Sequence, residues 1–252
     1  MIQHLRFLSL GIGLALFLGA CQVTDPTKLD NDKEIFAQAE EFYRHGRYED
    51  AISFYQEITN SYPQSPFVVE SELKIAQAYF EKKDFFEAGT HFLSFQSLHP
   101  THEKSSFVAA QIGLCQFKRA PKSPTKDQTQ TRRAVESFKQ VMQKWPDSEE
   151  AKMVAPYLEK AQVKLDESEY SIARFYFRQR NYAAVLKRLE DLKENALSYE
   201  IKTKSWFLLG KTHYRMKNHE LAQKAFETVA FQDKDLKRKK KAQHYLSKLK
   251  SK

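Results

Sequence analysis

Glycine and proline are scarce in this chain, with 7 glycines and 8 prolines among 252 residues. Alanine, glutamate, lysine, leucine and glutamine are all common. Glycine and proline disfavour helix interiors, whereas these other residues favour them. The composition is therefore typical of a helical protein.

Cysteine is also rare, and the two cysteines have different predicted fates. Cys115 lies in an apolar helical segment between Leu114 and Phe117, which predicts a buried and inert thiol. Cys21 ends the N-terminal apolar run and is a candidate for acylation. If Cys21 is acylated, Cys115 has no partner in the chain for a disulfide.

Motifs for catalysis or cofactor binding are missing. We find no nucleophile motif, no glycine-rich phosphate loop and no zinc-protease helix motif. His99 and His102 share one turn, but no further ligand lies in register with them, so we favour a solvent-exposed helix stop over a metal site. The sequence thus predicts a protein that is not an enzyme and that binds no cofactor and no metal. An enzyme with a helical regulatory domain is disfavoured because the repeats described below take up nearly the whole chain.

Residues 1–20 have the features of an export signal. Arg6 precedes an apolar run from Phe7 to Ala20, which is too short and too rich in glycine to span a bilayer. The run ends in Leu-Gly-Ala-Cys, which resembles a bacterial lipoprotein box with Cys21 as the acylated residue; the alternative is an ordinary signal peptide with a chance cysteine. Residues 21–32 are polar and predict a tether, with Asp32 as a possible cap for the first helix. Gln22 after the cysteine favours the outer membrane over the inner one.

A pattern of small, aromatic and proline residues repeats after 37 positions. A repeat at a fixed offset is the signature of stacked helix pairs, in which small residues allow close approach and proline ends the second helix. The pattern resembles tetratricopeptide repeats. The two matching sets are Ala39, Phe42, Tyr48, Ala51, Tyr55, Ile58 and Pro63, and Ala76, Tyr79, Phe85, Ala88, Phe92, Phe95 and Pro100.

Three further repeats follow, the first of them interrupted. Gly113 keeps the offset of 37 from Ala76, but Ala134 lies 46 residues after Ala88, so 9 residues are inserted within 121–130. A long helical segment from Ser148, containing Pro156, then joins repeat three to repeat four. The last two repeats regain the period, with Ala173, Tyr176, Tyr182, Val185, Leu189 and Leu192 matching Gly210, His213, His219, Ala222, Phe226 and Val229. His213 and His219 replace tyrosines and are predicted to be packing residues.

We therefore predict an all-α fold, a tetratricopeptide-repeat solenoid of about five helix pairs spanning residues 33–232. The N-terminal repeats cover 33–100 and the C-terminal repeats cover 103–232. Residues 233–252 form a basic tail with nine Lys or Arg against two Asp. Two interpretations of the tail stay open: a solvated helix end that caps the solenoid, or a contact with anionic phospholipid or an acidic partner surface.

An aromatic residue follows four positions after the small packing residue of every first helix. Two alternatives stay open for this set, which we call the aromatic ladder: packing between neighbouring first helices, or a groove that binds extended, aromatic-rich peptide. The groove hypothesis assigns peptide binding to Tyr43 and Phe80. The aromatic ladder consists of Tyr43, Phe80, Phe117, Phe177 and Tyr214.

Several motifs together resemble the BamD (ComL/YfiO) family of outer membrane protein assembly lipoproteins. They are the predicted acylated cysteine, the five repeats, the turns at 60–66 and 99–102, and the segment Glu-Tyr-Ser-Ile-Ala-Arg-Phe-Tyr at 169–176. The resemblance covers about residues 16–195 well and the remainder loosely. The rebuilt loop at 121–131 and the strongly basic tail depart from the family pattern.

The resemblance implies a lipid-anchored scaffold subunit of the β-barrel assembly (BAM) complex on the periplasmic face of the outer membrane. The N-terminal repeats would receive the C-terminal targeting strand of unfolded barrel proteins, with Tyr62 at a matching position. The C-terminal repeats would dock on the POTRA domains of BamA, with Arg188 pairing with an acidic residue of BamA. Other BAM lipoproteins are further expected partners, and nucleic acid is not. The alternative is a tetratricopeptide lipoprotein that serves as an adaptor for peptidoglycan hydrolases or proteases.

Overall fold

The computed structural model describes residues 25–28 and 31–251, and these residues form helices and no strands. The predicted signal segment 1–20 and Cys21 lie outside the described residues. None of the described helices has both the length and the apolar character needed to cross a membrane. The helices are η1 (Pro26–Lys28), α1 (Asp32–Arg44), α2 (Tyr48–Ser61), α3 (Val68–Glu81), α4 (Phe85–Leu98), α5 (Ser105–Arg119), α6 (Thr129–Lys144), α7 (Glu149–Arg178), α8 (Tyr182–Asn195), α9 (Tyr199–Arg215), α10 (His219–Gln232) and α11 (Leu236–Lys250).

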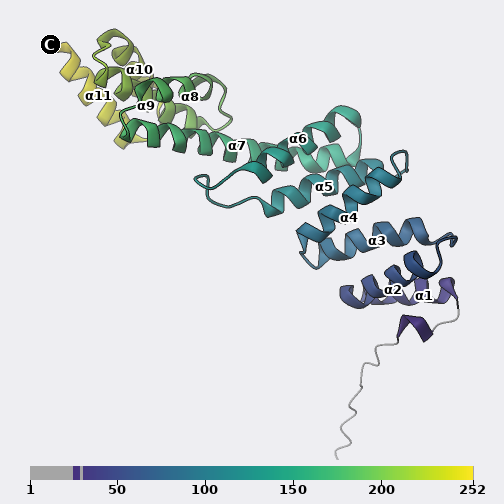
Figure 1. The fold of residues 1–252 in the computed structure, drawn as a ribbon. Helices are drawn as coiled ribbons and strands as arrows, with labels where there is room; N and C mark the ends of the chain where they lie inside the picture. Colours follow the sequence, from purple (N-terminus) through teal and green to yellow (C-terminus); the bar gives the residue numbers. More distant parts are fainter. Residues whose placement is uncertain (1–24, 29–30, 252) are drawn as a thin grey trace, which may run out of the picture.

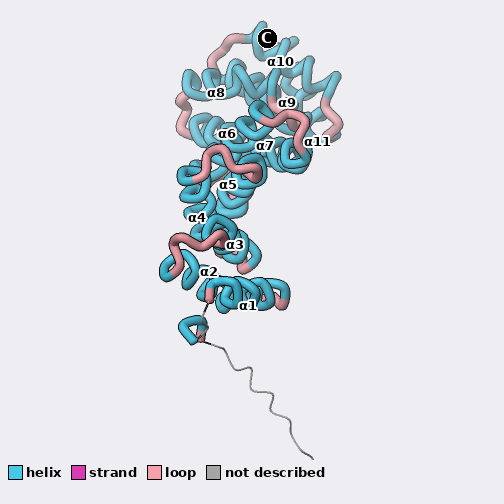
Figure 2. Tube along the Cα trace, turned by 90° about the vertical axis from the view of Figure 1, so that its right-hand side faces the viewer, coloured by secondary structure: helices cyan, strands magenta, loops and turns pink. Residues whose placement is uncertain are grey.

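Each helix packs against its neighbours in sequence, so the molecule is an elongated stack of helix pairs. Figure 1 places α1 and α11 at opposite ends, and the view in Figure 2 shows the same extended arrangement. The pairs are α1–α2, α3–α4, α5–α6, α7–α8 and α9–α10. The structure thereby confirms the predicted all-α solenoid of about five pairs.

The second helices end just before the prolines that were expected to stop them. The helices α2, α4 and α6 end two residues before Pro63, Pro100 and Pro146. Proline disfavours helical backbone in the residue that precedes it, so the helix stops upstream. The next first helix then starts after a short turn.

The turns between first and second helices share one backbone geometry in four of the five pairs. A residue with positive φ follows each first helix: Gly46 (73°), Lys83 (67°), Arg180 (58°) and Lys217 (64°). This residue donates its backbone N–H to the carbonyl three positions earlier, and the following residue donates to the carbonyl five positions earlier. Such left-handed caps satisfy the last carbonyls of a helix and reverse the chain. The pair α5–α6, which carries the insertion, lacks it.

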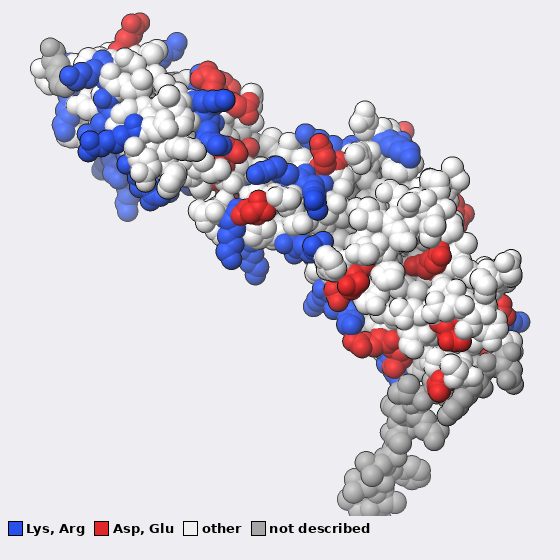
Figure 3. Space-filling model, viewed as in Figure 1, with Lys and Arg blue, Asp and Glu red and all other residues white. Residues whose placement is uncertain are grey.

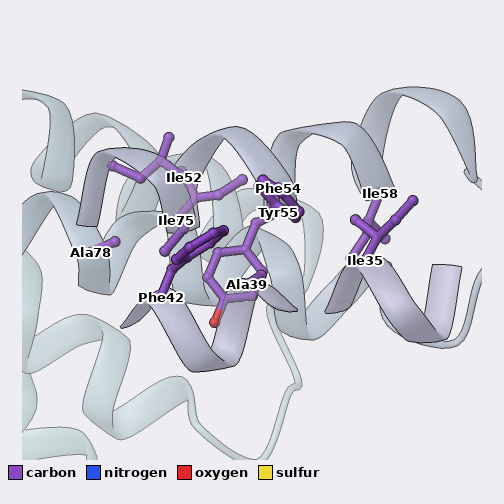
Figure 4. Packing of buried hydrophobic residues seen from close by; sticks show 10 residues of the cluster. Ile35, Ala39, Phe42, Ile52, Phe54, Tyr55, Ile58, Ile75 and Ala78 are labelled. Carbon is purple, nitrogen blue, oxygen red and sulfur yellow. The ribbon is translucent and has the colours of Figure 1, made fainter. Parts of the chain in front are cut away.

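The core consists of one apolar cluster for each helix pair. In the first cluster, Phe42, Phe54 and Tyr55 fill the space between α1 and α2, and Ile75 of α3 closes it (Figure 4). Two first helices carry a glycine opposite a large buried ring of the second helix. A Cβ on Gly113 would lie 2.6 Å from the Phe138 ring, and a Cβ on Gly210 would lie 2.7 Å from the Phe226 ring.

The long helix α7 packs against the helix pairs on both sides of it. The side chain of Ser148 accepts a hydrogen bond from the N–H of Ala151, as expected of an N-cap. The helix then runs for 30 residues through Pro156. It contacts α5 and α6 on one side of the molecule and α8 and α9 on the other. The helix thereby joins repeat three to repeat four without a loop.

Three details differ from the sequence predictions. The N-cap of α1 is Asn31, whose side chain accepts from the N–H of Glu34, and Asp32 is the first helical residue. His219 is exposed at the start of α10, although its ring makes an edge contact with Tyr214 at 6.3 Å, whereas His213 is half-buried. The inserted loop ends at Gln128, so Thr129 and Gln130 belong to α6.

Residues 236–250 of the basic tail form α11, which packs on α10. Tyr245 stacks on Phe226 with ring centroids 4.6 Å apart and an interplanar angle of 6°. Ala242 is fully buried beneath it. One face of this cationic helix therefore covers the last apolar cluster.

Candidate protein-binding surfaces

His99 is part of a structural contact within the second repeat. Its Nε2 lies 2.6 Å from a carboxylate oxygen of Glu72 on α3, and its ring packs on Phe95. The described residues contain no group of three or more His, Cys, Asp or Glu placed to hold a metal. Carboxylate pairing therefore accounts for His99 in the turn after α4.

Cys115 lies deep between α4 and α5. It is 1% exposed, and burial raises the pKa of its thiol to about 12. A thiol reacts as the thiolate, so this environment suppresses its nucleophilicity. Cys115 acts as an apolar packing residue.

The rings of the aromatic ladder are all half-buried at the ends of first helices. Four of them pack against the first residue of the following helix, as in the edge contact of Tyr43 with Tyr48 at 5.5 Å. The other three of these contacts are Phe80 with Phe85, Phe177 with Tyr182 and Tyr214 with His219. Phe117 instead contacts Phe138 and Tyr157. One face of each ring is thus used for packing, and part of each remains accessible.

Lysines of the next first helix lie over three of these rings. The Nζ atoms of Lys74, Lys164 and Lys211 lie 5.1, 5.5 and 4.7 Å from the centroids of Tyr43, Phe117 and Phe177. An ammonium at this distance from a ring face is attracted by the ring quadrupole. The accessible surface of the ladder therefore combines aromatic area with positive charge.

This arrangement was not visible in the sequence. Lys74, Lys164 and Lys211 follow their rings by 31, 47 and 34 positions, so no constant offset marks them. The offsets differ because the lysines lie at different points along the next first helix and because the inserted loop separates Phe117 from Lys164.

The predicted peptide-binding residues do not all lie together. Tyr43 contacts Tyr48 at the start of α2, whereas Tyr62 is the C-cap of the same helix. The 14 residues of α2 separate them by about 20 Å at 1.5 Å per residue. Tyr62 packs on the first apolar cluster and its carbonyl accepts from the N–H of Ser65 at 2.9 Å. Phe80 lies between the second and third pairs, at the same end of the layer as Tyr43.

Glu40 joins the first three helices and was missed in the sequence. Its carboxylate accepts a hydrogen bond from the hydroxyl of Tyr55 on α2 at 2.5 Å and pairs with Lys74 on α3 at 2.7 Å. Burial and this hydrogen bond raise the pKa of Tyr55, so the tyrosine stays a donor. The network holds Lys74 in place beside Tyr43.

Arg188 lies on α8 and forms an ion pair within the chain. Its Nη1 is 2.5 Å from Glu169 of α7, and its guanidinium carbon is 5.6 Å from the ring centroid of Tyr176. These side chains line a hollow of about 470 Å³ together with Asp166 and Lys187. Burial raises the pKa of Asp166, although the N–H of Leu197 donates to it at 2.9 Å. The hollow therefore carries both signs of charge on a half-exposed surface.

The comparisons with known proteins identify a family. The family model YfiO, described as outer membrane lipoprotein, matches residues 28–229. The outer membrane protein assembly factor BamD of Neisseria meningitidis is 25% identical over 199 residues, covering 73% of this chain and 74% of that protein. The BamD of Rickettsia prowazekii is 23% identical over 233 residues, covering 90% of each.

A solved structure, the TPR2AB-domain:pHSP90-complex of yeast Sti1, is 12% identical and covers 86% of this chain and 96% of that one, with a TM-score of 0.41. The family match covers both the N-terminal and the C-terminal repeats. This chain belongs to the YfiO family of outer membrane lipoproteins.

Proposed function

We propose that this protein is a subunit of the BAM complex, which assembles β-barrel proteins in the outer membrane. The observation that carries the proposal is the family match over residues 28–229, together with relatives named as outer membrane protein assembly factor BamD. Acylated Cys21 anchors it to the periplasmic face of that membrane. Its role is that of a scaffold that binds other proteins.

The N-terminal repeats bind the C-terminal targeting strand of an unfolded barrel protein. The accessible parts of Tyr43 and Phe80 support this, because aromatic rings give a large contact area at low cost in conformational entropy. Tyr62 lies about 20 Å away along α2, a distance that about six or seven residues of extended chain would span. One strand is therefore long enough to contact both places.

The C-terminal repeats bind the POTRA domains of BamA, with Arg188 as the pairing residue. Glu169 uses only one nitrogen of the guanidinium, and arginine has five N–H donors. A carboxylate of BamA can then share the arginine without displacing Glu169. Such a charged pair sets register and specificity more than affinity.

Depletion in the source bacterium tests the proposal. Depletion is expected to lower the level of outer membrane porins, and BamA purified from depleted cells lacks this subunit. A wild-type copy restores both, and a copy with Arg188→Glu restores neither. Normal porin assembly in depleted cells rejects the proposal. Co-purification of a peptidoglycan hydrolase or protease in place of BamA would favour the adaptor role.

A further inference from the structure

A second cleft lies at the C-terminal end of the molecule, between α7, α9 and α11. Its volume is about 470 Å³, and it is separate from the hollow at Arg188. Tyr170, Phe177, Phe207 and Leu208 supply its apolar surface. Figure 3 shows that Lys and Arg side chains gather at this end of the molecule.

The charges that line this cleft are nearly all positive. Two of its cations are neutralised within the chain: Lys204 pairs with Glu200 at 2.6 Å, and Arg238 pairs with Asp233 and Asp235. The others form no ion pair with the described residues. These unpaired cations are Arg174, Arg178, Lys211, Lys237 and Lys241.

Lys211 lies among the other unpaired cations of the cleft. It is half-buried, and its Nζ is 4.7 Å from the centroid of the Phe177 ring. Its pKa is lowered by burial and by the charges of Arg215, Lys241 and Arg174. Like charges held together in a partly desolvated cleft oppose one another, and a bound anion removes that repulsion.

We infer that this cleft binds an extended acidic segment of a partner polypeptide. Its carboxylates pair with Arg174, Lys211 and Lys241, and its apolar side chains contact Phe207. A membrane surface fits less well, because the half-buried ammonium of Lys211 stands inside a cleft that a flat bilayer cannot enter. The inference concerns a different surface from that of Arg188 and goes beyond the proposed function.

Fluorescence anisotropy with a defined probe tests this. The probe is a labelled decapeptide of alternating Glu and Asp, with the Gln and Asn decapeptide as its neutral control, and the protein is the full mature chain in non-ionic detergent. The variant is Lys211→Gln with Lys241→Gln. The matched control, Lys139→Gln with Lys224→Gln, removes the same charge from exposed positions outside the cleft.

The cleft variant is expected to weaken binding of the acidic peptide at least tenfold, and the control variant less than twofold. The cleft variant should keep its melting temperature, because neutral glutamine relieves repulsion. If both variants weaken peptide binding equally, the binding is nonspecific electrostatic attraction, and the inference is overturned. Binding to vesicles with phosphatidylglycerol through Lys211 and Lys241, without binding of the peptide, assigns the surface to lipid and also overturns it.

Discussion

Gly113 and Gly210 each face an aromatic ring that leaves no room for a Cβ atom. The Phe138 ring opposite Gly113 is held between Phe117 and Tyr157, and Phe226 is stacked on Tyr245. Neither ring can move away without disturbing a neighbour. Glycine at these positions therefore sets the distance between the two helices of a pair.

Gly113→Ala is expected to lower the stability of the protein. Alanine gains about 1 kcal/mol in helix propensity, but overpacking a close contact costs about 1–3 kcal/mol. Gly89→Ala is the matched control, because its Cβ would meet the Cβ of Cys115 at 3.4 Å, an ordinary contact. Thermal unfolding should show a lower midpoint for Gly113→Ala and a higher one for Gly89→Ala. Equal stabilisation by the two substitutions would show that the Phe138 ring moves aside to accommodate the alanine Cβ at position 113.

Stability should fall as the pH is lowered from 7.5 to 5.5, in part because of His91. Burial lowers the pKa of His91, whose ring stacks on Tyr79 at 5.1 Å. In the unfolded chain His91 binds a proton near pH 6.5, whereas in the folded chain it does so only at lower pH. The stability that neutral His91 contributes is therefore present above about pH 6.5 and is lost as the pH falls below that value. His91→Phe keeps a ring over Tyr79 and should reduce the loss in urea unfolding. The exposed His244→Gln serves as the control, and an equal loss in His91→Phe would remove His91 as a cause.

At the scale of the element, the left-handed turns define where each helix pair reverses. Three of the four turns use lysine or arginine at positive φ, and only the first uses glycine. The side chain adds steric strain in this conformation. The following Asp84 and Asn181 then cap the second helices of their pairs.

Lys217→Gly should raise stability by about 0.5–1 kcal/mol, because glycine adopts positive φ without strain. Lys224→Gly makes the same chemical change on the exposed face of α10 and should lower stability by about 1 kcal/mol. Denaturant midpoints of the two variants give the comparison. Destabilisation by Lys217→Gly would contradict the strained turn.

The helix α11 completes the C-terminal layer through Tyr245. Tyr245→Ala removes the ring stacked on Phe226 and should cost about 2–3 kcal/mol. Tyr245→Phe keeps the ring and should be close to the wild type. Near-ultraviolet circular dichroism and melting temperature report both. An unchanged melting temperature for Tyr245→Ala would mean that α11 does not contribute to the fold.

The sequence predicted the elements better than the contacts between them. Small residues and rings recur at an offset of 37 from repeat one to repeat two and from repeat four to repeat five, because each pair needs a close approach of its helices and a filled gap between them. The ion pairs Glu169–Arg188 and Glu72–His99 each lie within one helix pair, and the period does not encode which charged positions face each other there. In α11 the helical spacing of the apolar residues Ala242, Tyr245 and Leu249 could have predicted a packed helix, but the many lysines of this segment obscured the pattern.

At the scale of the whole molecule, each helix pair among the described residues packs mainly against the pairs next to it. The stabilities of the two ends are therefore largely independent. Tyr43, Tyr62 and Phe80 lie in the N-terminal repeats, and Arg188 lies beyond α7 (Figure 1). A substitution at one end should therefore leave the fold of the other intact. This arrangement suits a scaffold that holds two proteins at once.

In-cell photocrosslinking followed by mass spectrometry tests most directly whether the two ends of the molecule bind different partners. A photoreactive residue replaces Arg188 or Tyr62, with exposed Lys224 as the control position. The account predicts that position 188 crosslinks to BamA and position 62 to unfolded barrel proteins. Crosslinks from position 188 to a cell-wall enzyme in place of BamA, or none above the Lys224 control at either position, would contradict it.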